Sequence, residues 1–233
     1  MKLSRRLEKI AAYVPRGSRV VDIGSDHGYL AMKLIETHGA LHVVATDVTR
    51  GPVEKLQRNI AARGLGAVIE VIQTDGLKQV TGTVEVVVIA GMGGLLIRDI
   101  IRDSLQRAQR SRRMILQPMS QSEPLRRFLH QTGFRICHEA VVFEENKFYE
   151  IIVVEKGSQH FERAFDYEIS PILRRELDGD ARAYLRYRRN LLEKIAGNIE
   201  QKGADHEKLK VLRDRIRCYE EAIDHENQHP EGH

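Results

Sequence analysis

Residues 20–29 read Val20-Val21-Asp22-Ile23-Gly24-Ser25-Asp26-His27-Gly28-Tyr29, and this stretch decides the fold. The apolar beginning is typical of a buried strand, and the glycines that follow predict a tight turn that opens a helix. Glycines at such a turn let the backbone approach a ligand closely, and the N-terminus of the next helix offers free N–H groups. The stretch therefore predicts a strand–turn–helix unit with a ligand at the turn.

On either side of this turn, from Ser18 to Glu155, short β-branched runs alternate with amphipathic stretches. This alternation is typical of a parallel sheet covered by helices on both faces. The predicted strands are 19–23, 42–47, 68–73, 84–90, 114–118, 134–143 and 148–155, and the predicted helices are 27–37, 52–63, 95–109 and 122–132. Only Glu144 to Lys147 separate the last two strands, too few residues for a parallel crossover, so we expect an antiparallel hairpin. A seven-stranded, mostly parallel sheet that ends in a reversed hairpin is the class I methyltransferase variant of the Rossmann-like α/β fold.

The composition changes beyond Lys156-Gly157-Ser158, where strand-like runs vanish and charge rises. We therefore predict two domains, 1–159 and 160–233. In the second domain apolar residues recur at alternating spacings of three and four, which predicts two long helices turning around Gln201 to Asp205 and pairing as an antiparallel coiled coil. The polar tail from Asn227 to His233 is expected to be disordered.

The bulk composition narrows the class of protein. The chain has 233 residues and a net charge of +4, which allows an anionic partner without requiring one. The two cysteines, Cys137 and Cys218, are far apart, and no His/Cys cluster has zinc-ligand spacing, so we expect a reducing compartment and no metal. No apolar run reaches membrane-helix length and no signal sequence is evident, so we expect a cytoplasmic protein that does not bind membranes and is a monomer.

The acid at Asp22 favours one ligand over another at the glycine turn. A carboxylate there suits a ligand that carries an ammonium group, as the methionine part of S-adenosylmethionine does. NAD would bring a pyrophosphate to the same turn and would be repelled by the acid, and the G-x-G-x-x-G spacing of dehydrogenases is absent. The turn alone would also fit a Rossmann-like fold with another ligand.

Two more acids stand at the ends of successive predicted strands. Asp47 ends the second strand, where a carboxylate can accept both ribose hydroxyls. Asp75-Gly76 ends the third, where the side chain or backbone can reach the adenine amino group. The ordinary alternative for each is a turn or helix cap. Three acids in series at strand ends favour the cofactor interpretation.

The fourth strand runs into Ile89-Ala90-Gly91-Met92-Gly93-Gly94, at the edge where open α/β sheets bind ligands. Methyltransferases that act on base nitrogens meet their substrate here, often with an Asn/Asp-Pro-Pro-Tyr/Phe motif that this chain lacks. The glycines leave room for a planar base to lie against backbone. The alternative is a tight strand-to-helix turn without a ligand.

Taken together, these stretches resemble the bacterial tRNA (adenine-22-N1) methyltransferases, the TrmK family. The resemblance lies in residues 22–29, in Ala90-Gly-Met-Gly-Gly94, in Leu116-Gln117-Pro118 and in the hairpin Glu145-Asn-Lys-Phe-Tyr-Glu150, and with the helical appendage it covers nearly the whole chain. Asp26 replaces the middle glycine of the broader pattern Asp-x-Gly-x-Gly-x-Gly.

The resemblance implies transfer of a methyl group from S-adenosylmethionine to N1 of an adenine in the D-arm region of tRNA, which must be splayed out of its stack. Its implied cofactor residues are Asp22, Gly24, Ser25, Asp26, His27, Gly28, Asp47, Asp75, Gly76, Ala90 and Gly91. The base pocket is expected to comprise Tyr29, Gly91, Met92, Gly93 and Tyr149. Asp26 and His27 could contact substrate or cofactor, or His27 could simply begin the helix.

For the rest of the tRNA, arginines concentrate in two regions: Arg98, Arg102, Arg107, Arg110, Arg112, Arg113, Arg126 and Arg127 in the first domain, and Arg182, Arg186, Arg188 and Arg189 among Tyr184 and Tyr187 in the second. For about half of them, ion pairs on a solvated helix are the better interpretation. Two other functions stay open at this stage. One is a methyltransferase of the same fold that acts on a small molecule or a protein, and the other is a non-catalytic RNA-binding adaptor.

Overall fold

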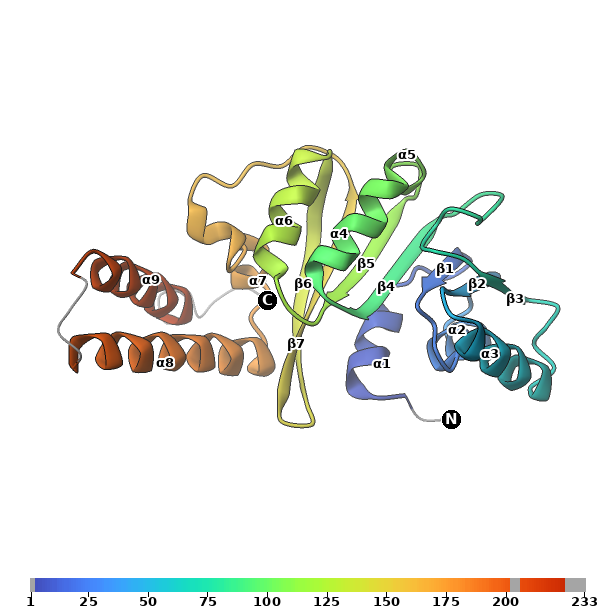
Figure 1. The fold of residues 1–233 in the computed structure, drawn as a ribbon, viewed down its shortest axis with the longest axis horizontal. Helices are drawn as coiled ribbons and strands as arrows, with labels where there is room; N and C mark the ends of the chain where they lie inside the picture. Colours follow the sequence, from blue (N-terminus) through green and yellow to red (C-terminus); the bar gives the residue numbers. More distant parts are fainter. Residues whose placement is uncertain (1–2, 202–205, 225–233) are drawn as a thin grey trace, which may run out of the picture.

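A computed structural model describes residues 3–201 and 206–224, in which seven strands form one sheet of order β3-β2-β1-β4-β5-β7-β6. The strands are β1 (Arg19–Ile23), β2 (His42–Asp47), β3 (Ile69–Gln73), β4 (Val86–Met92), β5 (Arg113–Pro118), β6 (Phe134–Glu144) and β7 (Lys147–Lys156). The first five are parallel, and β7 lies antiparallel between β5 and β6. The predicted sheet is confirmed (Figure 1).

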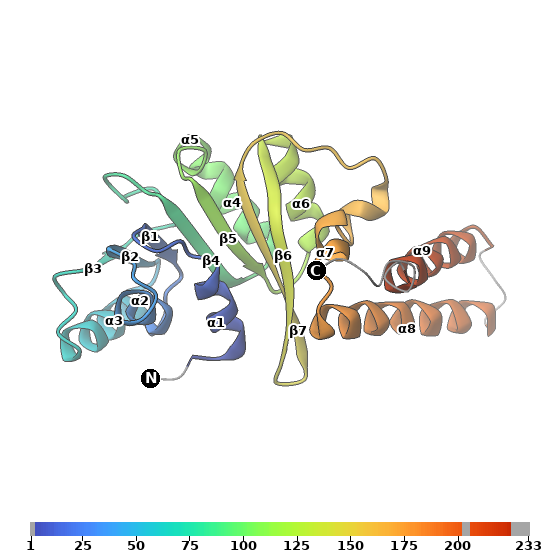
Figure 2. The same cartoon turned by 180° about the vertical axis from the view of Figure 1, so that it is seen from behind.

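Helices cover both faces of the sheet (Figures 1 and 2). On one face lie α1 (Arg5–Ala12), α2 (Tyr29–Glu36) and α3 (Arg50–Ala62), and on the other lie α4 (Gly94–Asp103), α5 (Leu105–Ala108) and α6 (Ser122–Gln131). The central strand β4 shows why both faces need cover. Val86 and Val88 pack into the core beneath α1, α2 and α3, whereas Val87 and Ile89 pack into the core beneath α4, α5 and α6. Successive side chains of a strand point to opposite faces of the sheet.

The reversed hairpin is made by a two-residue turn. Glu145 and Asn146 have φ values of 49° and 60°, the left-handed backbone that a tight hairpin turn demands, and Glu144 pairs with Lys147 in the ladder. Asparagine tolerates this conformation better than most residues. The predicted antiparallel pair is confirmed, and it extends the sheet beyond the parallel part.

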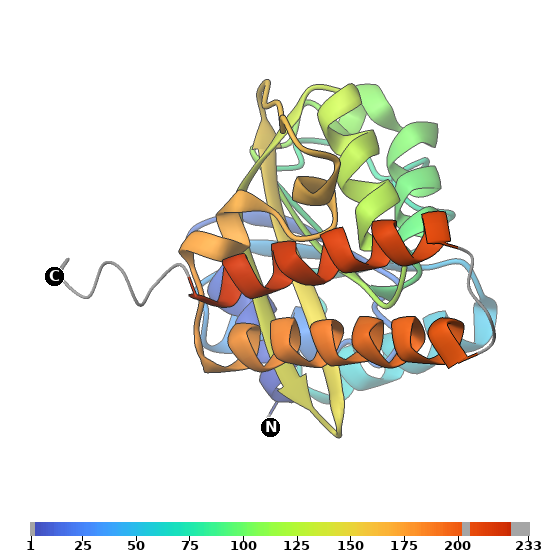
Figure 3. The ribbon, with the colours of Figure 1, turned by 90° about the vertical axis from the view of Figure 1, so that its left-hand side faces the viewer.

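The C-terminal part is helical, as predicted, with η1 (Ala164–Tyr167), α7 (Pro171–Arg175), α8 (Gly179–Gln201) and α9 (His206–Asp224). The two long helices lie side by side (Figures 1 and 3), and Tyr219 of α9 is fully buried in a third core that also takes in Val141 of β6. The coiled-coil geometry and the division at residue 159 stay predictions. The predicted disordered tail, residues 227–233, lies outside the described residues.

Three features differ from the sequence prediction. Helix α1 was not predicted, because its few apolar residues stand among charged ones. It begins at Ser4, whose side chain accepts a hydrogen bond from the N–H of Leu7 at 3.3 Å. The predicted helix 95–109 is two helices, because Ser104 leaves the helical backbone at φ −132°. The five-residue α7 was also missed. Within the described part of the chain, no helix has the length and apolar character needed to cross a membrane.

Candidate active site

The turn after β1 is built as the glycine pattern predicts. The N–H groups of Gly24 and Ser25 both donate to the carbonyl of Thr46, at 2.9 Å each, which ties the turn to β2. Gly24 and Gly28 have φ values of 72° and 75°, and Asp26 adopts a φ of 47° without being glycine. Glycine takes such backbone at little cost and aspartate tolerates it better than most residues, so the turn is built from residues suited to left-handed backbone.

Asp22 is a buried acid that has no cationic partner among the described residues. It is 4% exposed and accepts a hydrogen bond from the Ser25 hydroxyl. Burial raises its pKa to about 6, and the hydrogen bond from Ser25 works in the opposite direction. A carboxylate that is buried without a counter-ion is suited to a ligand that brings the positive charge.

A pocket of about 330 Å³ opens in front of this acid. Of the predicted residues it is lined by Asp22, Gly24, Ser25, Asp26, His27, Tyr29, Ala90 and Gly91. The ends of β1 and β4 are neighbours in the sheet, which brings the two glycine-rich segments together. At Gly24 the space is already occupied, because a Cβ atom there would come within 2.2 Å of the Met92 methyl carbon. Because that methyl is the end of a flexible side chain and can shift, the stronger reason for glycine here is its φ of 72°.

The remaining predicted cofactor residues lie outside the lining of this pocket. Asp47 stands at the adjacent strand end and accepts from the backbone N–H and hydroxyl of Thr49, at 3.0 and 2.9 Å. Asp75 forms an ion pair with Lys78 at 2.5 Å. These are the turn and surface contacts that short acids commonly make. Gly28 and Gly76 are packing positions, where a Cβ atom would meet Leu56 at 2.4 Å and Ile100 at 2.9 Å.

The loop after β4 is open on one side and closely packed on the other. Gly91 is exposed, with φ 79°, and its N–H donates to Oε1 of Gln117 at 3.1 Å. Gly93 caps α4, and the Met92 carbonyl accepts from the N–H of Met119 at 2.8 Å. Gly94 lies against the backbone of residues 120–121, where a Cβ atom would come within 2.3 Å of an oxygen. The loop is thus fixed against the end of β5, with Gly91 facing solvent.

Tyr29 and His27 form the outer rim of the pocket. Their rings stack with centroids 5.0 Å apart and planes 10° from parallel. His27 Nε2 lies 3.2 Å from Lys55 Nζ and 3.3 Å from the Asp26 carboxylate. The rim thus presents a flat aromatic surface that is 44% exposed at Tyr29.

Two residues that the sequence analysis missed as site residues lie at the centre of this region. Arg6 of α1 lines the pocket, and Gln117 at the end of β5 holds both Arg6 Nη1, at 2.5 Å, and the Gly91 N–H. The Gln117 side chain is fully buried, and its Nε2 donates to the Pro118 carbonyl at 2.9 Å. Arg6 was missed because helix α1, which carries it to the pocket, was not predicted. Gln117 stood in a stretch that carried the family resemblance.

A larger cleft of about 990 Å³ separates the hairpin and the end of β5 from α8. Tyr149, predicted for the base pocket, lines this cleft, and Arg6, which lines the smaller pocket, lies over its ring at 5.2 Å, so the contact between these two side chains stands between the two cavities. Tyr187 on the opposite wall is 53% exposed and contacts Phe148, with ring centroids 5.5 Å apart. The cleft also holds Lys147 and Arg186, neither of which has an ion-pair partner in the described residues.

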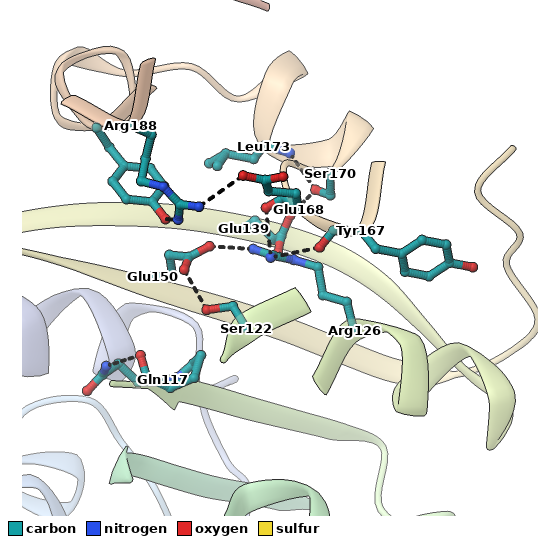
Figure 4. Close-up of polar contacts among 12 residues, drawn as sticks. Gln117, Ser122, Arg126, Glu139, Glu150, Tyr167, Glu168, Ser170, Leu173 and Arg188 are labelled. Carbon is teal, nitrogen blue, oxygen red and sulfur yellow. Dashed lines mark hydrogen bonds and ion pairs between the residues drawn. The ribbon is translucent and has the colours of Figure 1, made fainter. Parts of the chain in front are cut away.

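The floor of the cleft is a buried ionic network (Figure 4). The Arg126 side chain, 1% exposed, bonds to Glu139 at 2.7 Å and to Glu150 at 2.6 Å, and Glu150 accepts from the Ser122 hydroxyl at 2.5 Å. Arg126 also donates to the carbonyls of Tyr167 and Glu168, at 3.2 and 3.1 Å. The network therefore joins α6, both hairpin strands and the segment that leads into the helical part.

Ionisation in this network reflects burial and pairing. Burial raises the pKa of Glu139 to about 7 despite the opposing effect of Arg126. Burial also acts to raise the pKa of Glu150, but Arg126 and Ser122 outweigh it and the pKa is lowered. Burial alone would lower the pKa of Arg126, whereas the two carboxylates raise it strongly, so the guanidinium stays charged.

Most arginines predicted to face tRNA are engaged within the protein. The prediction that Arg126 contacts RNA was wrong, because its side chain is buried. Others in the first domain have partners: Arg98 and Arg102 pair with Asp99, Arg113 with Glu155, and Arg127 with Glu123. In the helical part, Arg188 pairs with Glu168 at 2.9 Å and Arg189 with Glu193 at 3.5 Å. Ion pairs within one helix thus account for Arg98, Arg102, Arg127 and Arg189, whereas Arg113 pairs from strand β5 and Arg188 pairs with the segment before α7. In the described part of the chain no three potential metal ligands cluster.

The sheet order, the reversed hairpin and the pocket at the ends of β1 and β4 define a class I, Rossmann-like methyltransferase. Residues 20–221 match the model of one family, "TrmK: tRNA (adenine(22)-N(1))-methyltransferase". The chain belongs to this family.

Individual relatives agree over almost the full length. The tRNA (adenine(22)-N(1))-methyltransferase of Bacillus subtilis is 33% identical over 97% of this chain and 98% of its own. The crystal structure of the Bacillus subtilis m1A22 tRNA methyltransferase TrmK superposes with a TM-score of 0.84 at 32% identity, covering 96% of this chain and 99% of that one. The candidate tRNA (m1A22) methyltransferase Sp1610 of Streptococcus pneumoniae, crystallised with S-adenosyl-L-methionine, superposes with a TM-score of 0.85 at 34% identity, covering 95% and 100%.

Proposed function

We propose that this chain methylates N1 of adenine 22 in tRNA, with S-adenosylmethionine held at the ends of β1 and β4. The observation that carries the proposal is Asp22, a buried acid without a cationic partner in the described residues, facing a pocket that adjoins the exposed Gly91. In this proposal Asp22 faces the ammonium group, Asp47 the ribose, and Asp75 with Gly76 the adenine of the cofactor. The remaining predicted cofactor residues form the wall between them.

The cofactor, when bound, supplies an electrophilic methyl group on a sulfonium. Neutral adenine presents an in-plane lone pair at N1, so the chain needs no general base before the transfer. Its residues orient the base and exclude water. Gly91, Met92 and Gly93 offer a flat backbone surface for the base, and Tyr29 on the rim and Tyr149 in the cleft flank it. Unstacking the nucleotide costs a few kcal/mol, which its contacts in the pocket must repay.

The tRNA around the target lies, in this proposal, along the cleft between the hairpin and α8. Support comes from the exposed ring of Tyr187 and from Lys147 and Arg186, whose charges are not neutralised by described residues. Aromatic faces stack on unpaired bases, and lysine and arginine contact phosphates. We expect tRNA affinity to fall steeply with salt, and Arg186→Glu to weaken it, whereas Arg112→Glu in the loop before β5 should have little effect.

The test is mass spectrometry of nucleosides from tRNA incubated with methyl-labelled S-adenosylmethionine. Labelled 1-methyladenosine is expected, and a transcript with guanosine at position 22 should carry no label. Label in another nucleoside, or label that persists in the guanosine transcript, would contradict the assignment. A missing thermal shift on addition of S-adenosylmethionine would favour the adaptor alternative. We also propose that the enzyme works as a monomer in the cytoplasm, consistent with two free cysteines.

A further inference from the structure

Arg6 projects a guanidinium into the cofactor pocket from a helix outside the glycine-rich segments. Nη1 donates to Oε1 of Gln117 at 2.5 Å and lies 3.7 Å from where a Cβ atom of Gly91 would stand. The neighbouring Tyr149 ring, at 5.2 Å, is apolar over most of its face. No carboxylate of residues 3–201 or 206–224 lies within ion-pair distance of Arg6. The guanidinium is thus held by neutral groups only.

Among the charged side chains that line the pocket, Asp22 and Arg6 have opposite signs and neither has an ion-pair partner in the described residues, whereas the third, Asp26, lies 3.3 Å from His27. Asp22 lines it from β1 and Arg6 lines it from α1. A ligand with an ammonium and a carboxylate on one carbon complements both, and the amino-acid end of S-adenosylmethionine has this chemistry. The target adenine of tRNA is a poorer match for Arg6. Methylation at N1 turns that base into a cation, which the guanidinium would repel.

We infer that Arg6 binds the methionine carboxylate of S-adenosylmethionine, and that Gln117 is the residue that positions Arg6. The inference rests on the proposed function and adds a binding residue to it. A charge-assisted hydrogen bond between guanidinium and carboxylate is among the stronger polar contacts in proteins, and it gains further strength in a partly enclosed pocket.

Gln117 can hold Arg6 in place because its own amide cannot turn. Its Nε2 donates to the Pro118 carbonyl at 2.9 Å, so its Oε1 must face Arg6 and the Gly91 N–H. The residue is fully buried at the end of β5. One amide oxygen thus fixes both the guanidinium and the first exposed glycine of the loop after β4.

Calorimetric titration with two ligands tests the inference. S-adenosylhomocysteine carries both the ammonium and the carboxylate, and its decarboxylated analogue keeps adenosine and ammonium but lacks the carboxylate. Arg6→Ala should weaken S-adenosylhomocysteine by about 10- to 100-fold, which corresponds to losing one charged hydrogen bond. The same change should alter the affinity for the decarboxylated analogue by less than about twofold, and Arg6→Lys should recover part of the loss.

Arg5→Ala is the matched control. Arg5 is the adjacent residue of α1, and its guanidinium bonds instead to the Phe143 carbonyl at 2.7 Å and to Asp180 at 3.0 Å. The ratio of the two affinities should be unchanged in this variant. Gln117→Leu should weaken the binding of S-adenosylhomocysteine several-fold alone and by a smaller factor in the Arg6→Ala background, since the part of its effect that passes through Arg6 is then absent and only the release of the Gly91 N–H remains.

The outcomes separate this inference from the proposed function. If Arg6→Ala weakens both ligands equally, Arg6 only shapes the pocket and the inference is wrong. If Arg6→Ala leaves the affinity for both ligands unchanged and raises the KM for tRNA, the guanidinium contacts an RNA phosphate instead. Additive effects of Gln117→Leu and Arg6→Ala would refute the positioning role. If the unaltered protein binds neither ligand, the proposed function itself fails.

Discussion

Removing Arg126 tests whether the buried ionic network stabilises the fold. Arg126→Met keeps most of the side-chain volume but leaves Glu139 and Glu150 without their cation, and the side chains of Arg126 and Glu139 are each 1% exposed. Stripping one partner from a buried pair costs about 3 to 5 kcal/mol, because the remaining charge is buried and uncompensated. With a urea slope of about 3 kcal/mol/M, the unfolding midpoint should fall by about 1 to 1.7 M.

The dependence on pH identifies the cause of that loss. Without Arg126, burial raises the pKa values of both carboxyls in the folded state above their values in the unfolded chain. The folded protein then takes up protons more readily as the pH falls, so the deficit should be largest near pH 8 and shrink toward pH 5. Urea titrations followed by circular dichroism at both pH values measure it.

A triple variant, Arg126→Met with Glu139→Gln and Glu150→Gln, serves as the control, since it removes the buried charges together. It should regain at least half of the lost stability. A midpoint shift of less than about 0.3 M in the single variant, or a deficit independent of pH, would refute the reasoning, because the carboxylates would then have found other partners or water.

Three further predictions concern the site and its packing. Affinity for S-adenosylhomocysteine, measured by calorimetry, should be nearly constant between about pH 7 and 8, where the ligand keeps its ammonium, and should fall as the pH drops below the pKa of Asp22, about 6. Asp22→Asn should bind the ligand weakly and without this acid-side dependence. Asp47→Ala should weaken the binding of S-adenosylhomocysteine by about 1 to 3 kcal/mol. Unchanged affinity in a folded variant would show that Asp47 is not part of the site. Gly94→Ala should lower stability by about 1 to 3 kcal/mol, because its Cβ would strike backbone oxygens. Gly197→Ala, in open space within α8, should raise it by about 0.5 to 1 kcal/mol, and equal effects of the two in thermal melts would contradict the packing argument.

The sheet could be predicted from sequence because its strands carry strong, local signals. Val86 to Ile89 are apolar at every position, as a strand buried on both faces must be, and the short link between β6 and β7 permits only a hairpin. The pocket residues of the loop after β1 followed from a second local signal, since glycines directly after a strand mark a turn with left-handed backbone that can approach a ligand closely.

The sequence could not reveal contacts that depend on which charged residues meet in space. Arg126 stands next to Arg127 on a helix and looked available to RNA, yet it pairs with Glu139 and Glu150, 13 and 24 residues away. Arg6 meets Gln117 across 111 residues of chain. Hydrophobic periodicity does not encode such pairings, because charged side chains are read as surface residues by default.

The network beneath the cleft has a geometric consequence for RNA recognition. Apolar surfaces tolerate sliding because their attraction has no preferred direction, whereas a guanidinium shared by two carboxylates and two carbonyls fits in only one alignment. We therefore expect the spacing between the hairpin wall and the helical wall to stay nearly constant while RNA enters and leaves. An RNA whose shape does not match this fixed spacing would then fail to enter the cleft, and its adenine would not reach Gly91.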